Sequence, residues 1–124
     1  MEMSVSTVGE IKIVKLSGKV GWQNAYTLDK EINWLIQDGC RRMAFNLDEV
    51  TFICSGAIGC ILYNLNKFKD VGGGIYIISS NDYVNFVFRS TFGALLDGVM
   101  FSSFDEFRRV VMTAPQPGDP APEV

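Results

Sequence analysis

Residues 45–62, FNLDEVTFICSGAIGCIL, decide the fold. They continue the short apolar run Arg42–Leu47, pass through a turn, and enter a stretch of helical periodicity that begins at Ser55. A short apolar run followed by turn residues is typical of a buried strand. The periodicity predicts a helix over Ser55–Lys69, with an apolar stripe made of Ile58, Ile61, Leu62, Leu65 and Phe68. A strand that leads directly into a helix is typical of a layered α/β fold.

The same alternation continues on both sides of this stretch. The elements expected before it are strands at Ser4–Val8 and Ile11–Leu16, the second ended by Ser17-Gly18, and a helix from Gln23 to Gly39. After the glycines at 72–74, the expected elements are a strand at Ile75–Ser80, a helix at Asn81–Ser90 capped by Ser80 or Asn81, an edge strand at Val99–Ser102 and a closing helix at Ser103–Met112. The prediction is therefore an α/β fold, in which about four helices pack on a mixed sheet of four to five strands.

The last eleven residues differ in composition from the rest. Ala114–Val124, APQPGDPAPEV, holds all four prolines of the chain and shows no apolar periodicity. Such a segment is expected to be a disordered tail. We therefore assign residues 1–113 to one folded domain and residues 114–124 to the tail.

Composition narrows the classes of function. The net charge of −3 and the scattered basic residues argue against nucleic-acid binding. The chain has no histidine, which excludes histidine-dependent catalysis and histidine-ligated zinc. The cysteines at 40, 54 and 60 fit no metal or redox spacing and are expected to be reduced thiols. With no signal peptide and no membrane-length apolar run, we expect a soluble cytoplasmic protein without metal, cofactor or membrane insertion.

The opening stretch resembles the signature of the anti-sigma factor antagonists, which belong to the STAS family (sulphate transporter and anti-sigma factor antagonist). The family signature runs from a strand with an N-L-x-x-V-x-F pattern into a D-S-[ST]-G-[LI]-G turn that opens a helix. The residues on matching positions here are Asn46, Leu47, Val50, Phe52, Ser55, Ile58 and Gly59. The order of the elements, including Ser17-Gly18-Lys19-Val20 before the first helix, also fits, and the resemblance covers about residues 9–112.

The resemblance implies a STAS-like fold and a protein-interaction switch that regulates transcription or a stress output, not an enzyme. The implied partner is an anti-sigma factor or serine kinase of the histidine-kinase-like ATPase fold. Ser55 falls on the serine that the kinase phosphorylates, and a metal-dependent serine phosphatase would reverse the modification. The residues expected to contact the partner are Trp22, Cys54, Gly56 and Ala57.

Two departures from the family pattern support an alternative. The acidic residue that usually precedes the serine is Cys54, and a second family aspartate is matched by Gly21. The alternative is that the domain is a scaffold, stressosome-like or transporter-associated. In that case its turn docks a partner without phosphorylation.

The residues of the turn also have plainer explanations. Ser55 suits the N-cap of the following helix, because its hydroxyl can accept a bond from a first-turn N–H. Trp22 suits either a staple that packs on the helix behind it or an interface anchor. Cys54 is either a structural half-buried cysteine or, beside a helix N-terminus, a reactive thiol that senses redox state.

Overall fold

A five-stranded mixed sheet lies at the centre of the fold, in the order β1-β2-β3-β4-β5. The computed structural model describes residues 1–112. The strands are β1 (Glu2–Val8), β2 (Ile11–Val20), β3 (Arg42–Ile53), β4 (Gly74–Ile78) and β5 (Met100–Phe101). β1 is antiparallel to β2, whereas the other neighbours are parallel. The predicted α/β fold with a mixed sheet is confirmed.

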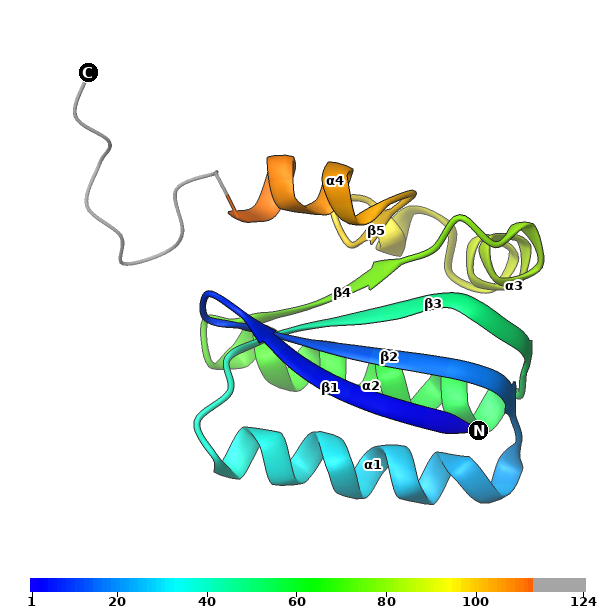
Figure 1. Cartoon of the computed structure of the whole chain (residues 1–124), viewed down its shortest axis with the longest axis horizontal. Coiled ribbons are helices and arrows are strands. Elements are labelled where there is room, and N and C mark those ends of the chain that lie inside the picture. Colours follow the sequence, from blue (N-terminus) through cyan, green and yellow to red (C-terminus); the bar gives the residue numbers. More distant parts are fainter. Residues whose placement is uncertain (113–124) are drawn as a thin grey trace.

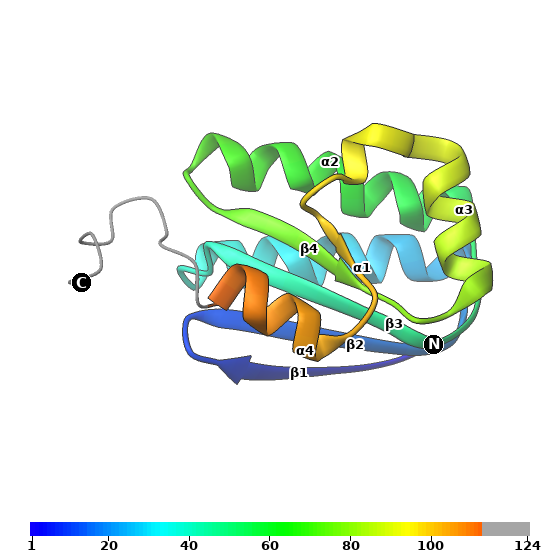
Figure 2. The same ribbon diagram turned by 90° about the horizontal axis from the view of Figure 1, so that it is seen from above.

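Helices cover both faces of this sheet. They are α1 (Trp22–Gln37), α2 (Ser55–Asp70), α3 (Asp82–Phe92) and α4 (Phe104–Phe107), with a 3₁₀ turn at Gly93–Leu96 and a π-helical turn at Arg108–Met112. α1 and α2 lie side by side on one face, and α4 lies on the other (Figures 1 and 2). α3 lies at the end of the sheet where β3 and α2 meet (Figure 2).

The sheet separates two apolar cores of unequal size. The larger core lies under α1, α2 and α3, and its fully buried members include Leu28, Phe45 and Phe88. The smaller core lies under α4 and contains Ile11, Ile13, Ala44, Ile78, Phe101, Phe107 and Val111. Parallel strands covered on both faces read as nearly continuous apolar runs. That is why the apolar pattern revealed these strands.

Two strands extend beyond their predicted carboxyl ends, and β1 begins two residues before its predicted start. β2 continues through Ser17-Gly18 to Val20, and β3 continues past Leu47 to Ile53. The backbones of β2 and β3 stay paired from Ser17–Glu49 to Val20–Ile53. The register shifts just before and just after Ser17-Gly18. Gly18 adopts φ +78°, which permits the irregularity. Backbone pairing therefore continues where the apolar pattern stops.

The closing helix is shorter and less regular than predicted. Only Phe104–Phe107 is α-helical, and Arg108–Met112 forms the π-helical turn. Ser103 is the N-cap of α4, and its hydroxyl oxygen accepts from the N–H of Glu106 at 3.1 Å. Phe107 and Val111 face the smaller core as expected. The predicted tail, residues 114–124, lies outside the described residues.

The glycines after α2 are required for two different reasons, a positive φ and close packing. Gly72 adopts φ +78° at the helix exit. A Cβ on Gly73 would lie 1.7 Å from the carbonyl oxygen of Arg41, so only glycine fits there. This contact brings the end of α2 against the start of β3.

Candidate functional site

The signature turn lies at the carboxyl ends of the parallel strands β2 and β3. The N–H of Cys54, just after β3, donates to the carbonyl of Val20, the last residue of β2, at 3.0 Å. The turns that open α1 and α2 are therefore held next to each other. In open α/β sheets this edge is where binding sites usually form.

Ser55 is exposed and is the first residue of α2. The prediction that it caps the helix is wrong. The cap is Cys54, whose sulfur lies 3.4 Å from the N–H of Ala57 and accepts from it. Ser55 already belongs to the helix, and within residues 1–112 its hydroxyl makes no hydrogen bond. Helix capping therefore does not explain the serine.

Trp22 is the first residue of α1. The sequence had predicted that the helix begins one residue later, at Gln23, with Trp22 in the preceding loop. Its side chain is 75% exposed. A Cβ added to Gly56 would lie 3.4 Å from Cε3 of Trp22, so the indole lies directly over the first turn of α2. The fold thus brings Trp22 and Gly56 together, as required if both contact a partner.

The other two predicted contact residues have different environments. Ala57 is fully buried, so its side chain packs in the core and has no surface to offer a partner. This corrects the prediction that Ala57 contacts a partner. Cys54 is half-buried, and its sulfur serves the helix cap.

The structure adds two aromatic residues to the site, and the sequence had not assigned either of them to it. Phe52, on β3, is 41% exposed. Tyr83, on α3, is 39% exposed, and its hydroxyl oxygen accepts from the N–H of Ile53 at 3.2 Å. With Trp22 they form what we call the aromatic rim of the turn: Trp22, Phe52 and Tyr83. Phe52 lies in the signature itself, but nothing local in the sequence indicates that Tyr83 reaches β3.

The charge around the turn is not the one the family pattern implies. Cys54 and Gly21 occupy the positions of the two family carboxylates, and Gly21 is the N-cap residue of α1. The ammonium of Lys19 instead lies 5.6 Å from the ring centroid of Phe52. The turn therefore combines an exposed hydroxyl, an aromatic rim and a cation.

A polar seam joins α1 and α2 further along. The Asn64 amide donates to the carbonyl of Cys60 at 2.8 Å, and the Cys60 thiol lies 3.9 Å from the Asp29 carboxylate. Burial first, and then the negative charge of Asp29, raise the pKa of Cys60 to about 11. In residues 1–112 no group of three or more histidine, cysteine, aspartate or glutamate side chains is placed to hold a metal.

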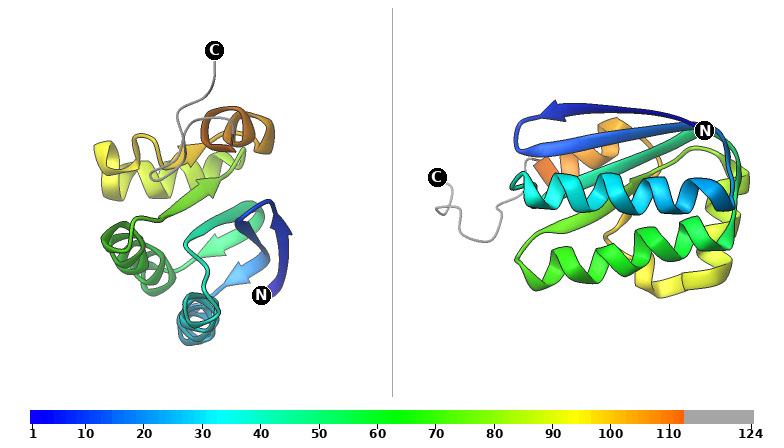
Figure 3. Two further views of the ribbon diagram at one scale, coloured as in Figure 1. Left: turned by 90° about the vertical axis from the view of Figure 1, so that its left-hand side faces the viewer. Right: turned by 90° about the horizontal axis from the view of Figure 1, so that it is seen from below.

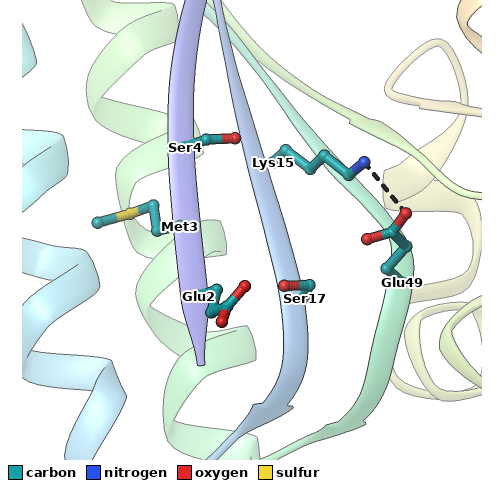
Figure 4. Close-up of a pocket in the computed structure, with 6 residues that line it drawn as sticks. All are labelled: Glu2, Met3, Ser4, Lys15, Ser17 and Glu49. Atoms are coloured by element: carbon teal, nitrogen blue, oxygen red, sulfur yellow. Dashed lines mark ion pairs between the residues drawn. The ribbon is translucent and has the colours of Figure 1, made fainter.

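Hollows in the described surface lie away from Ser55. One, of about 230 Å³ on the side of the sheet away from α1 and α2, is lined by Glu2, Met3, Ser4, Lys15, Ser17 and Glu49, with a Lys15–Glu49 ion pair of 3.1 Å (Figure 4). Another, of about 340 Å³, lies between the carboxyl ends of α1 and α2 and is lined by Asn33, Ile36, Cys40, Lys67, Phe68, Asp70 and Val71. Ser55 lines neither. An exposed serine that lines neither hollow suits a macromolecular partner better than a small molecule.

The family model of the STAS domain matches residues 2–107. The chain belongs to the STAS family. A comparison with curated proteins gives no match. None of the helices within residues 1–112 is long and apolar enough to cross a membrane.

Solved structures of anti-sigma factor antagonists share the fold at low sequence identity. The unphosphorylated anti-sigma factor antagonist SpoIIAA of Bacillus has a TM-score of 0.75 at 18% identity, covering 92% of this chain and 100% of its own. A putative anti-sigma factor antagonist from Thermotoga maritima has a TM-score of 0.78 at 21% identity, covering 89% and 94%. An anti-sigma factor antagonist from Mycobacterium paratuberculosis has a TM-score of 0.78 at 16% identity, covering 90% and 93%. SpoIIAA has also been solved in a phosphorylated form.

Proposed function

We propose that this STAS protein is an anti-sigma factor antagonist, a cytoplasmic switch without enzymatic activity of its own. Its β3–α2 turn docks an anti-sigma factor or serine kinase of the histidine-kinase-like ATPase fold. The observation that carries the proposal is Ser55, an exposed serine whose hydroxyl makes no hydrogen bond within residues 1–112, beside the aromatic rim. The anti-sigma factor antagonists among the solved neighbours support the class of partner.

The position of Ser55 suits a reversible modification. A phosphate there lies at the N-terminus of α2, where the helix dipole tolerates negative charge. The fold would therefore persist after phosphorylation. The phosphate adds about −1.5 to −2 charges in the middle of the docking surface, which opposes binding through desolvation and repulsion. A metal-dependent serine phosphatase would restore the docking form.

The aromatic rim provides the binding energy in this proposal. Exposed tryptophan and tyrosine are the residues most enriched among those that dominate interface energies. Trp22 lies over the first turn of α2, which begins at Ser55, so a partner that docks on the indole is expected to cover Ser55 as well. We therefore expect Trp22→Ala to weaken docking by at least tenfold while the fold is retained, because most of the indole is solvent-exposed.

The test uses the full chain as bait in lysate of the native cell. The baits are the wild type, Ser55→Asp and Ser90→Asp, the last being a matched control because Ser90 is exposed on α3. A kinase-like ATPase retained by the wild type and Ser90→Asp, and lost with Ser55→Asp, is the expected result. Incubation of that kinase with ATP should then place one phosphate on Ser55 of the wild type and none on Ser55→Ala.

The second candidate function is a scaffold that docks through the same turn without phosphorylation. The residues Cys54 and Gly21, which replace the two family carboxylates, favour it. It predicts a partner held equally by the wild type and Ser55→Asp, and no phosphate on Ser55 in cells. The paired pull-down therefore decides between the two functions.

A further inference from the structure

The two edges of the sheet differ in length and in how they end. β5 has only two residues, whereas β1 has seven and pairs with β2 from Glu2–Ser17 to Val8–Ile11 without a register shift. In residues 1–112, β2 is the only strand beside β1. The outer backbone groups of β1 are therefore open to another strand.

The sequence of β1 lacks the usual devices that protect an edge. Natural edge strands are blunted by proline, lysine, bulges or shortness. β1, EMSVSTV, has no proline, no lysine and no bulge, and its one charge is at Glu2. Val5 lies opposite the core residue Val14, yet it is 40% exposed. This edge is unusually ready to pair.

The chain's own C-terminal residues are poor candidates for this edge. Met112, the last described residue, lies beside the β1–β2 turn, with its Cε 3.8 Å from a Cβ built on Gly9. Residues 113–124 include four prolines, at 115, 117, 120 and 122. Proline has no N–H to donate to a strand ladder.

A second copy of β1 fits the edge. With a two-fold axis at Val5, Val5 faces Val5 of the other copy, Ser4 faces Ser6, and Met3 faces Thr7. At the centre, valine and hydroxyl side chains then meet across the strands, and Glu2 faces Val8, so no charged residue faces a like charge. We propose that two copies of this protein pair antiparallel through β1 and form one continuous sheet.

The helix layer supplies further contact in this arrangement. Asp29 and Asn33 reach residues of α2, so helical periodicity puts Trp34, 58% exposed, on the other flank of α1. β1 lies beside α1 on that flank (Figure 3). A two-fold axis perpendicular to the sheet keeps both α1 helices on the same face. The two Trp34 side chains then border the space above the paired strands.

The dimer keeps the signature turn free. The side chains of Glu2 and Ser4 lie on the side of the sheet away from α1 and α2, and Met3 lies toward these helices (Figure 4), so pairing along the edge covers neither face. Antiparallel pairing places the two β3–α2 turns at opposite ends of the dimer. The pairing does not depend on the proposed function, and it would make each assembly bivalent for a partner.

The first test is sedimentation of the full chain over a wide range of concentrations. We expect a mass that rises from 13.8 kDa towards twice that value. Val5→Lys puts two ammonium groups opposite each other and should raise the dissociation constant about tenfold or more. Val71→Lys, at a site of 52% exposure at the end of α2, should leave it unchanged.

The second test fixes the register. In the proposed pairing the two Val5 Cα atoms are about 4.5–5.5 Å apart, within disulfide range. The two Thr7 residues are about 14 Å apart along the strands, beyond it. Mild oxidation should therefore cross-link Val5→Cys and not Thr7→Cys. A monomer at every concentration, a dimer unaffected by Val5→Lys, or equal cross-linking of the two variants would overturn the proposal.

Discussion

The turns that open α2 and α3 follow neighbouring parallel strands, β3 and β4, but they are built in opposite ways. Before α3, Asn81 accepts from the N–H groups of Tyr83 and Val84 at 3.0 and 3.3 Å. Its amide also donates to the carbonyl of Val50 at 2.6 Å. This turn is tied both to its own helix and to the end of β3.

Further bonds hold the same turn from outside. The Asp48 carboxylate accepts from the N–H of Ser80 at 2.6 Å and from its hydroxyl at 3.1 Å. The Ser79 hydroxyl oxygen accepts from the N–H of Asn81 at 3.1 Å. Nearly every polar side chain of the β4–α3 turn is therefore used in structure.

The β3–α2 turn has a single weak cap, the sulfur of Cys54, and the hydroxyl of Ser55 has no structural partner within residues 1–112. Sulfur is a weaker acceptor than an amide or carboxylate oxygen. One turn is thus fixed by its own side chains, whereas the other leaves its serine and aromatic rim available. The difference supports the proposal that the β3–α2 turn is the docking surface.

The largest expected effect is a difference in alkylation rate between Cys54, at the β3–α2 turn, and Cys60, inside α2. Because the pKa of Cys60 is raised from 9.0 to about 11, its thiolate fraction below pH 9 is about 100-fold smaller than that of an ordinary thiol. Burial also raises the pKa of Cys40. An alkylating reagent at neutral pH should therefore modify Cys54 first, as read by peptide mass spectrometry.

Asp29→Asn provides the control for this reactivity. Removal of the carboxylate lowers the pKa of Cys60, so its alkylation should accelerate, while burial keeps it slower than an ordinary thiol. Cys60 modified as fast as Cys54 in the wild type would contradict the comparison. If Cys54→Ala retains partner binding under both oxidising and reducing conditions, the redox-sensor hypothesis for Cys54 is wrong.

The next effect compares the two caps directly. Asn81→Ala removes the α3 cap and leaves the carbonyl of Val50 without its bond, at a cost of about 2 kcal/mol of unfolding free energy. Cys54→Ala removes only a sulfur acceptor and should cost about 0.5 kcal/mol. Urea unfolding measures both, with Asn66→Ala on the exposed face of α2 as the control. Equal losses for Asn81→Ala and Cys54→Ala would mean that the turns are built alike.

Sequence patterns predicted the order of the elements and the core stripes, because each helix and each buried strand carries its own periodicity. They missed the ends of β2 and β3, since the residues after Leu47 are held by backbone pairing and not by an apolar pattern. Asp48 and Glu49 interrupt that pattern while the strand continues.

The site was only partly predictable, for two physical reasons. Whether Cys54 or Ser55 caps α2 depends on which residue first adopts helical dihedral angles, and adjacent positions in sequence do not reveal this. The aromatic rim depends on Tyr83 reaching the N–H of Ile53, a contact between α3 and β3 that only the packed fold creates. The aromatic residues near position 83 were visible in the sequence, but their exposure was not.

The smallest expected effect comes from Cys54→Asp, a substitution that would give the β3–α2 turn an oxygen cap like that of the β4–α3 turn. Cys54→Asp places a carboxylate at the N-cap of α2, where it accepts first-turn N–H groups and complements the helix dipole. The unfolding free energy at pH 7 should rise by about 0.5–1 kcal/mol. These bonds lower the pKa of the new carboxyl, so the gain should be present above its ordinary pKa of about 3.9 and lost as the pH falls below it. Urea unfolding at neutral and acidic pH measures both.

The same variant tests what the missing family carboxylate does. If Cys54→Asp gains stability and its kinase also phosphorylates Ser55 faster, the carboxylate serves both the cap and the modification. If stability rises while phosphorylation is unchanged, Cys54 is a tolerated substitution in a working switch. No gain in stability at any pH would show that the α2 start is already closed by other contacts, and the contrast with α3 would then fail.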